Sequence, residues 1–140
     1  MRYVNKQAIT LVALLVLLVA GSSYYYFRLV TTDSPYIVNN SMEYYLLVPT
    51  VLKQLPLDSM DQVMRYSYTA ADADKPAVVS VEFVTHLFAG TAYEKMVNYF
   101  DGLGFDHTQG ELSQGNIKVQ ITHTGSELGA VLMKVEILER

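Results

Sequence analysis

Residues 77–100 read AVVSVEFVTHLFAGTAYEKMVNYF, and this stretch decides the fold because it joins two different periodicities. Residues 77–88 alternate with period 2 and carry apolar side chains on both faces, which predicts a central β-strand. Thr91 and Glu94 then have the form of a capping box, in which each side chain bonds the backbone N–H of the other. We therefore expect a helix to begin at Thr91. Its apolar stripe predicts docking on a sheet and comprises Tyr93, Met96, Val97 and Phe100.

Three segments outside this stretch also alternate as β-strands do, at residues 63–69, 117–123 and 130–138. Polar turns at 70–76 and 124–129 join the strands into two hairpins, and we expect a loop over 105–115. With a helix at 41–55, the order is helix, strand, strand, helix, strand, strand. This order predicts a two-layer α+β domain in which both helices lie on one face of a four-stranded antiparallel sheet.

The helix at 41–55 has Ser41 as its expected N-cap and carries apolar residues at helical spacing. Pro49 interrupts it, because proline removes a backbone hydrogen bond and clashes with the preceding turn. The helix therefore either kinks at Pro49 or starts afresh there. We expect Pro56 to end it.

The N-terminal segment 8–27, AITLVALLVLLVAGSSYYYF, contains no charged residue and has the length of a transmembrane helix. Arg2 and Lys6 precede it, so the positive-inside rule places the N-terminus in the cytoplasm. We expect an anchor over residues 1–30, a linker over 31–40 and an exported domain over 41–140. This topology predicts the cytoplasmic membrane of a bacterium, with the domain in the periplasm or outside the cell. Residues at the outer membrane interface would be Tyr24, Tyr25, Tyr26, Phe27 and Arg28.

A cleaved secretory signal is the alternative interpretation of this segment. The basic start and apolar stretch fit that plan, as do the small residues Ala20, Gly21, Ser22 and Ser23. Both interpretations export the C-terminal domain. Apolar character resumes after Ser23, which favours a retained anchor.

Charge and cysteine content exclude several classes of function. The formal net charge is -4, and residues 31–140 carry 7 basic and 14 acidic residues. Nucleic-acid binding is not expected, because phosphate contacts need a basic patch. The chain has no cysteine, and therefore no disulfide, no thiolate metal site and no lipid-modified cysteine.

Four features follow one another along the chain: Leu55-Pro56 before the first hairpin, VEFVT at 81–85, an aromatic helix at 93–100 and Gly104-Phe105 after it. In this plan the chain resembles small exported α+β domains of uncharacterised bacterial envelope proteins, many of them lipoproteins. The resemblance implies an exported domain and names no activity. Because the lipidated cysteine is missing here, a peptide anchor is the expected tether.

The sequence contains no catalytic constellation, so we expect no enzyme activity, no cofactor and no metal site. His86, His107 and His123 do not share the spacing of metal ligands. Asp72 and Asp74 lack the glycine and the closing glutamate of a calcium loop.

Tyrosine-rich sequence just beyond the anchor indicates a partner surface, since tyrosine supplies a large contact area at low entropic cost. Its expected residues are Tyr36, Tyr44, Tyr45 and Pro49. The hypothesis is a single-pass membrane protein whose domain binds or scaffolds a protein partner, as an accessory subunit of a membrane complex. The alternative is a module that binds a small ligand, a lipid or a peptidoglycan fragment. An enclosed apolar pocket would favour the ligand module, whereas an exposed apolar patch or a free sheet edge would favour the partner.

Overall fold

The computed structural model describes residues 6–108, 110–125 and 129–139, and divides the chain into two units that meet between Thr32 and Asp33. The first unit is the 26-residue helix α1 (Lys6–Thr31). Within it, Ala8–Thr31 is long and apolar enough to cross a membrane. A membrane anchor and a signal sequence both fit this helix, and residues 24–28 lie in its last turns.

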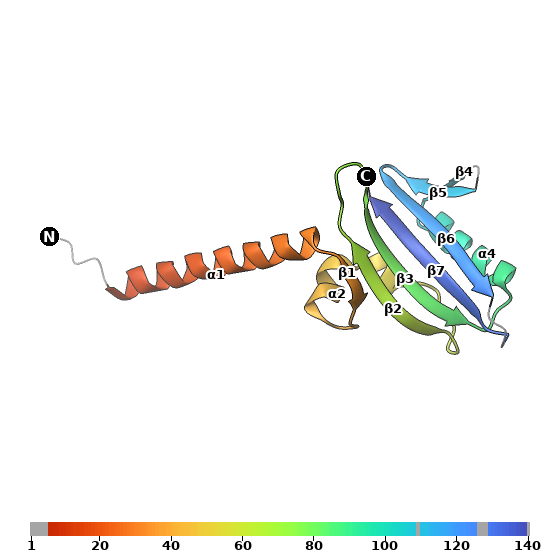
Figure 1. The fold of residues 1–140 in the computed structure, drawn as a ribbon, viewed down its shortest axis with the longest axis horizontal. Helices are drawn as coiled ribbons and strands as arrows, with labels where there is room; N and C mark the ends of the chain where they lie inside the picture. Colours follow the sequence, from red (N-terminus) through yellow and green to blue (C-terminus); the bar gives the residue numbers. More distant parts are fainter. Residues whose placement is uncertain (1–5, 109, 126–128, 140) are drawn as a thin grey trace. The chain divides into compact units, whose positions relative to one another are not determined.

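The second unit is built on a seven-stranded antiparallel sheet with the order β1-β2-β3-β7-β6-β5-β4 (Figure 1). The four expected strands are its four longest and lie together at its centre: β2 (Gln62–Thr69), β3 (Ala77–Thr85), β7 (Val131–Glu139) and β6 (Ile117–Gly125). The expected count of four was wrong, because short strands extend both sides: β1 (Ser34–Ile37), β4 (Asp106–Thr108) and β5 (Glu111–Gln114).

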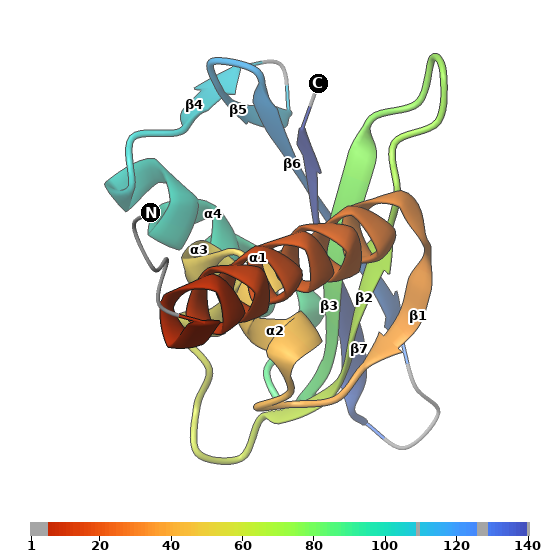
Figure 2. The ribbon, with the colours of Figure 1, turned by 90° about the vertical axis from the view of Figure 1, so that its left-hand side faces the viewer.

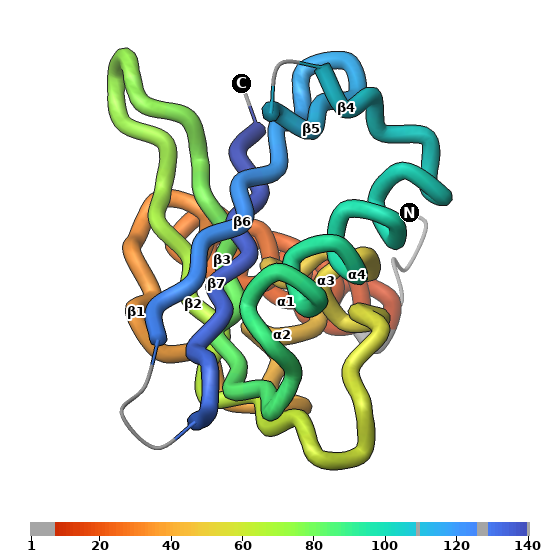
Figure 3. The backbone as a smooth tube through the Cα atoms, turned by 90° about the vertical axis from the view of Figure 1, so that its right-hand side faces the viewer, coloured from red at the N-terminus to blue at the C-terminus, as the bar shows by residue number. Residues whose placement is uncertain are grey.

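The helices α2 (Met42–Leu47), α3 (Thr50–Lys53) and α4 (Ala89–Gly102) lie on one side of this sheet (Figures 2 and 3). Between the layers, the core is made by alternate residues of the central strands and by the inward faces of the helices. Its most deeply buried members include Val81, Phe83, Met133, Val135, Leu52, Met96 and Phe100. The expected α+β arrangement is confirmed, and β3 is a central strand between β2 and β7.

The outer face of the sheet carries polar pairs between β2 and β3. The Arg65 guanidinium donates two hydrogen bonds, both of 2.9 Å, to the Glu82 carboxylate on the neighbouring strand. The hydroxyls of Ser67 and Ser80 lie 2.6 Å apart and share a hydrogen bond. An antiparallel sheet can leave one such face in water while the other carries the core.

The expected linker at 31–40 was wrong, because β1 lies within it and pairs with β2. Ile37 contributes to the core with 2% of its surface exposed, and the Asp33 carboxylate accepts a hydrogen bond from the Ala70 N–H at 2.8 Å. One buried side chain and one long-range hydrogen bond fix a segment whose composition is that of a connector. The second unit therefore begins at Asp33 and not at residue 41.

The helical region at 41–55 forms two short helices separated at Pro49. Ser41 is the N-cap of α2, as expected, and its hydroxyl accepts a hydrogen bond from the Tyr44 N–H at 3.1 Å. Pro49 is the N-cap of α3, so a new helix starts there instead of a kinked helix continuing. The structure thus selects the second of the two expectations for Pro49.

The junction between β3 and α4 differs from the expected capping box. β3 ends at Thr85, whose buried hydroxyl accepts from the Leu87 N–H at 3.2 Å. α4 begins two residues before Thr91, with Phe88 as an N-cap that has no side-chain hydrogen bond. Phe88 was expected in the strand but is 87% exposed. The turn at Thr85 ends β3 before Phe88, and α4 therefore begins at Ala89 instead of Thr91.

The C-terminus of α4 is closed by a Schellman motif. The Phe105 N–H donates to the Phe100 carbonyl at 3.1 Å, and the Gly104 N–H donates to the Asp101 carbonyl at 2.9 Å. Gly104 has φ +87°, a left-handed conformation that favours glycine. The chain then enters β4 and β5, so the loop expected over 105–115 was wrong.

Candidate functional site

Exposed large apolar side chains of the second unit concentrate on β1, α2 and β2. We define the tyrosine surface as Tyr36, Val38, Met42, Tyr45, Leu46 and Met64, whose exposed fractions lie between 46% and 62%. Tyr36 and Met64 line one pocket, and large exposed apolar patches mark interaction sites. The residues of the tyrosine surface lie in three segments that the sequence predicts as separate elements: the expected linker, the expected helix at 41–55 and the expected strand at 63–69.

Helix α2 contributes most of this surface because it is apolar on both sides. Its inward side buries Leu47, with Val48 beyond its end. Met42, Tyr45 and Leu46 stand at i, i+3 and i+4, and therefore share the opposite face. A helix that is apolar all round is normally covered all round, whereas the described residues of the second unit leave the outward face of α2 exposed.

Met64 joins this surface through a β-bulge. Val63 pairs with Phe83, but Arg65 pairs with Glu82, so Met64 is an extra residue in β2. Without the bulge, the alternation expected from sequence would place Met64 beside Tyr66 in the core. Met64 is instead 53% exposed, while Tyr66 keeps its inward position at 5%.

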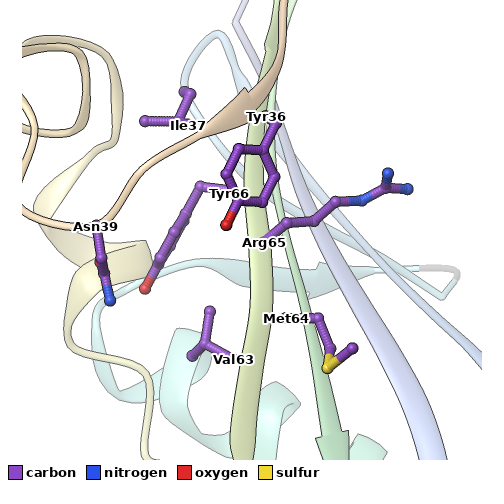
Figure 4. A pocket seen from close by; sticks show the side chains of 7 residues that line it. All are labelled: Tyr36, Ile37, Asn39, Val63, Met64, Arg65 and Tyr66. Atoms are coloured by element: carbon purple, nitrogen blue, oxygen red, sulfur yellow. The ribbon is translucent and has the colours of Figure 1, made fainter.

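A small pocket of about 100 Å³ lies between β1 and the bulge (Figure 4). Seven residues line it, namely Tyr36, Ile37, Asn39, Val63, Met64, Arg65 and Tyr66. In Figure 4 the Arg65 guanidinium points away from the other side chains, which is consistent with its pairing to Glu82. The pocket is a shallow depression in the tyrosine surface, and it is smaller than the roughly 300 Å³ at which small-molecule sites begin.

Two aromatic rings, those of Tyr44 and Tyr66, support the surface from beneath. The ring of Tyr44 packs edge-on against those of Tyr45 and Tyr66, with centroid separations of 5.5 Å and 5.2 Å. Burial, together with smaller contributions from the charge of Tyr44 and a hydrogen bond with it, raises the pKa of Tyr66 to about 12. The Tyr66 phenol is therefore neutral and fixed at physiological pH.

Lys53 and Asn40 hold the exposed Tyr45 in place. The Lys53 ammonium lies 4.8 Å from the centre of the Tyr44 ring and 5.5 Å from that of Tyr45, and it donates to the Tyr45 carbonyl at 3.3 Å. The Tyr45 hydroxyl donates to Asn40 Oδ1 at 3.3 Å. An exposed ring restrained in this way loses little entropy when it is covered, which favours binding.

The structure brings the expected site residues into one region but gives them different roles. Tyr36 and Tyr45 are each 61% exposed and lie on the surface. Tyr44 is half-buried and supports them, and Pro49 is half-buried at the start of α3. Sequence reasoning missed Val38, Met42, Leu46 and Met64. The i, i+3, i+4 spacing on α2 could have identified Met42 and Leu46 from the sequence. The β-bulge that exposes Met64 has no sequence signal.

The histidines show no sign of a metal centre. His86, His107 and His123 are all exposed, and the described residues contain no group of three His, Cys, Asp or Glu placed to hold an ion.

Comparison with protein-family models, with curated proteins and with solved structures finds no match to this chain.

Proposed function

We propose that the protein is a single-pass membrane protein whose exported domain binds a partner protein through the tyrosine surface. The observation that carries this proposal is the uncovered apolar face of α2, with Met42 62%, Tyr45 61% and Leu46 46% exposed. In this proposal α1 stays as the anchor with its N-terminus in the cytoplasm, and the domain lies in the periplasm or outside the cell.

Chemistry favours a protein over a lipid surface as the occupant. Tyrosine and methionine are enriched in protein interfaces, and four of the six residues of the tyrosine surface are of these two types. The excess of acidic residues over residues 31–140, 14 against 7, repels anionic headgroups. The depression beside Tyr36 also suits an inserted side chain better than a planar bilayer.

The anchor adds to the affinity of this surface for a partner in the same membrane. Tyr36 follows Arg28 by eight positions, so even a fully extended chain keeps it within roughly 28 Å of Arg28, the last of the expected interface residues. A tethered surface meets a membrane-bound partner at a high effective concentration, which makes a modest interface sufficient. This supports the role of accessory subunit in a membrane complex.

Site-specific photo-crosslinking in intact membranes tests the proposal. A photoreactive residue at position 42 should give one discrete protein adduct, and the same residue at position 60 should not. Met60 is a matched control because it is an exposed methionine, at 74%, outside the tyrosine surface. Tyr45→Ala should abolish the adduct at position 42 without unfolding the domain, since the ring is largely exposed.

Three outcomes would contradict the proposal. Equal adducts at positions 42 and 60 would mean that the contact is non-specific, and lipid adducts alone would assign the surface to the bilayer. Mass spectrometry of the membrane-bound protein should find the N-terminal peptide intact, whereas a mature start at Ser22 or Ser23 would disprove the anchor.

A further inference from the structure

Strand β6 is paired on both sides over only part of its length. Its neighbour β5 pairs with Ile117, Lys118 and Val119, while β7 pairs with every β6 residue from Ile117 to Gly125. In the described part of the chain, β6 beyond Val119 therefore has a strand on one side only. Figure 3 faces this side of the sheet, with β4 and β5 beside the upper part of β6.

The hairpin between β5 and β6 shows which backbone groups face the open side. Gln114 and Ile117 flank a two-residue turn in which Gly115 has φ +61°. In such a turn the two flanking residues form a hydrogen-bonded pair, so the backbone N–H and C=O of Ile117 point toward β5. Backbone groups alternate in direction along an antiparallel strand. The N–H and C=O of Ile121 and His123 therefore point to the open side, and those of Thr122 point to β7.

An open groove runs along this edge, between α4 and the inner face of β6. One section, of about 470 Å³, is lined by Gly90, Tyr93, Ile121, Thr122 and His123. A second section, of about 230 Å³, shares Tyr93, Ile121 and Thr122 with the first and continues to Leu112 and Val119. The groove thus offers apolar contacts beside a row of free backbone groups.

We propose that the free edge of β6 binds an extended segment of a partner protein as an additional β-strand. Main-chain hydrogen bonds would join the segment to Ile121 and His123, and its alternate side chains would enter the groove against Tyr93. The site is separate from the tyrosine surface and does not depend on the function proposed for it.

The negative charge of the domain indicates which kind of segment would bind. Residues 31–140 carry twice as many acidic as basic residues, 14 against 7, so edge-to-edge pairing of two copies would bring like charges together. A segment with apolar residues at alternate positions and lysine or arginine at its ends complements both the groove and the charge.

Amide hydrogen exchange of the full chain in lipid nanodiscs tests this, with the peptide Lys-Val-Thr-Val-Thr-Val-Lys as the probe. At about ten times its Kd, the probe should slow exchange at Ile121 and His123 about tenfold, because exchange then proceeds from the free fraction. Exchange at Thr122 should not change, since its N–H already faces β7. The same peptide with glutamate ends, or with proline in place of threonine, should bind more weakly.

Two variants sharpen the test. His123→Pro removes an outward N–H and leaves the β7 ladder intact, as an edge strand tolerates, so it should fold and lose the probe. Met42→Gln changes the tyrosine surface and should keep the probe. Were Ile121 and His123 to exchange unchanged with saturating probe, or Thr122 to slow equally, the unmodified chain alone would overturn the proposal. Protection that grows with protein concentration without probe would assign the edge to a second copy and also overturn it.

Discussion

Raising the pH above 10 should destabilise the second unit, Asp33–Arg140, through Tyr66. This side chain is 5% exposed beneath the tyrosine surface, and burial raises the pKa of its phenol from 10.0 to about 12. Tyr66 ionises near pH 10 in the unfolded chain and near pH 12 in the folded domain. Between these values the unfolded chain binds fewer protons, so the free energy of unfolding falls as pH rises.

The magnitude follows from the difference between the two pKa values. Two pKa units, at about 1.4 kcal/mol each, correspond to a full loss of about 2.7 kcal/mol once the phenol is ionised in both states. About 1.9 kcal/mol of this is lost between pH 10 and pH 12, because Tyr66 is half-ionised in the unfolded chain at pH 10 and in the folded domain at pH 12. Below about pH 9 Tyr66 contributes no pH dependence, because the phenol is neutral in both states. Since domains of this size are stable by only about 5 to 15 kcal/mol, the loss should be easy to measure.

Urea unfolding of the full chain in micelles at a series of pH values, followed by near-ultraviolet circular dichroism, measures this effect. Tyr66→Phe keeps the buried ring and removes the ionisable hydroxyl, so the variant should lose about 1.9 kcal/mol less than the parent chain between pH 10 and pH 12. Parallel curves for the two proteins would refute the reasoning, as would ionisation of Tyr66 near pH 10 in the folded state.

Two further predictions concern α4 and its termination. Phe100→Ala should reduce stability by about 3 to 5 kcal/mol in a urea titration, since Phe100 is 0% exposed and packs edge-on against Phe105. The exposed Leu103→Ala should change it by less than about 0.5 kcal/mol, and equal losses would contradict the packing described. Gly104→Ala should cost about 1 to 2 kcal/mol because φ is +87°. Gly102→Ala, which has open space and lies in the helix, should instead stabilise by up to about 1 kcal/mol; the same sign for both glycine variants would refute the left-handed cap.

The central strands were predictable because each carries a long alternating pattern that burial enforces. β1, β4 and β5 have only three or four residues, SPYI, DHT and ELSQ, and no repeat long enough to detect. Their strand conformation comes from pairing, of β1 with β2, of β5 with β6 and of β4 with β5, which is a tertiary effect. The capping box at Thr91 failed for a related reason, since the Thr85 turn had already positioned the helix start.

The candidate site was only partly predictable because it depends on which side of α2 the domain covers. Apolar residues at helical spacing are ordinarily assigned to a core, and Leu47 fulfils that expectation. Met42 and Leu46 are equally apolar, and only the folded arrangement shows that they face outward. Side-chain chemistry alone predicts Tyr36, Tyr44 and Tyr45 as contact residues, and it cannot distinguish the two exposed rings from Tyr44, which supports the surface from beneath.

The two proposed binding sites lie far enough apart to act independently. Four interstrand spacings of about 4.8 Å separate β1 from β6 in the order β1-β2-β3-β7-β6, a distance of roughly 19 Å across the sheet. Sites separated by more than about 10 Å with no shared partners usually contribute additively. Met42→Gln should therefore weaken only the partner of the tyrosine surface, and His123→Pro only the added strand. A domain of this size can in this way join two partners at one membrane, because a segment on β6 leaves the outward face of α2 free.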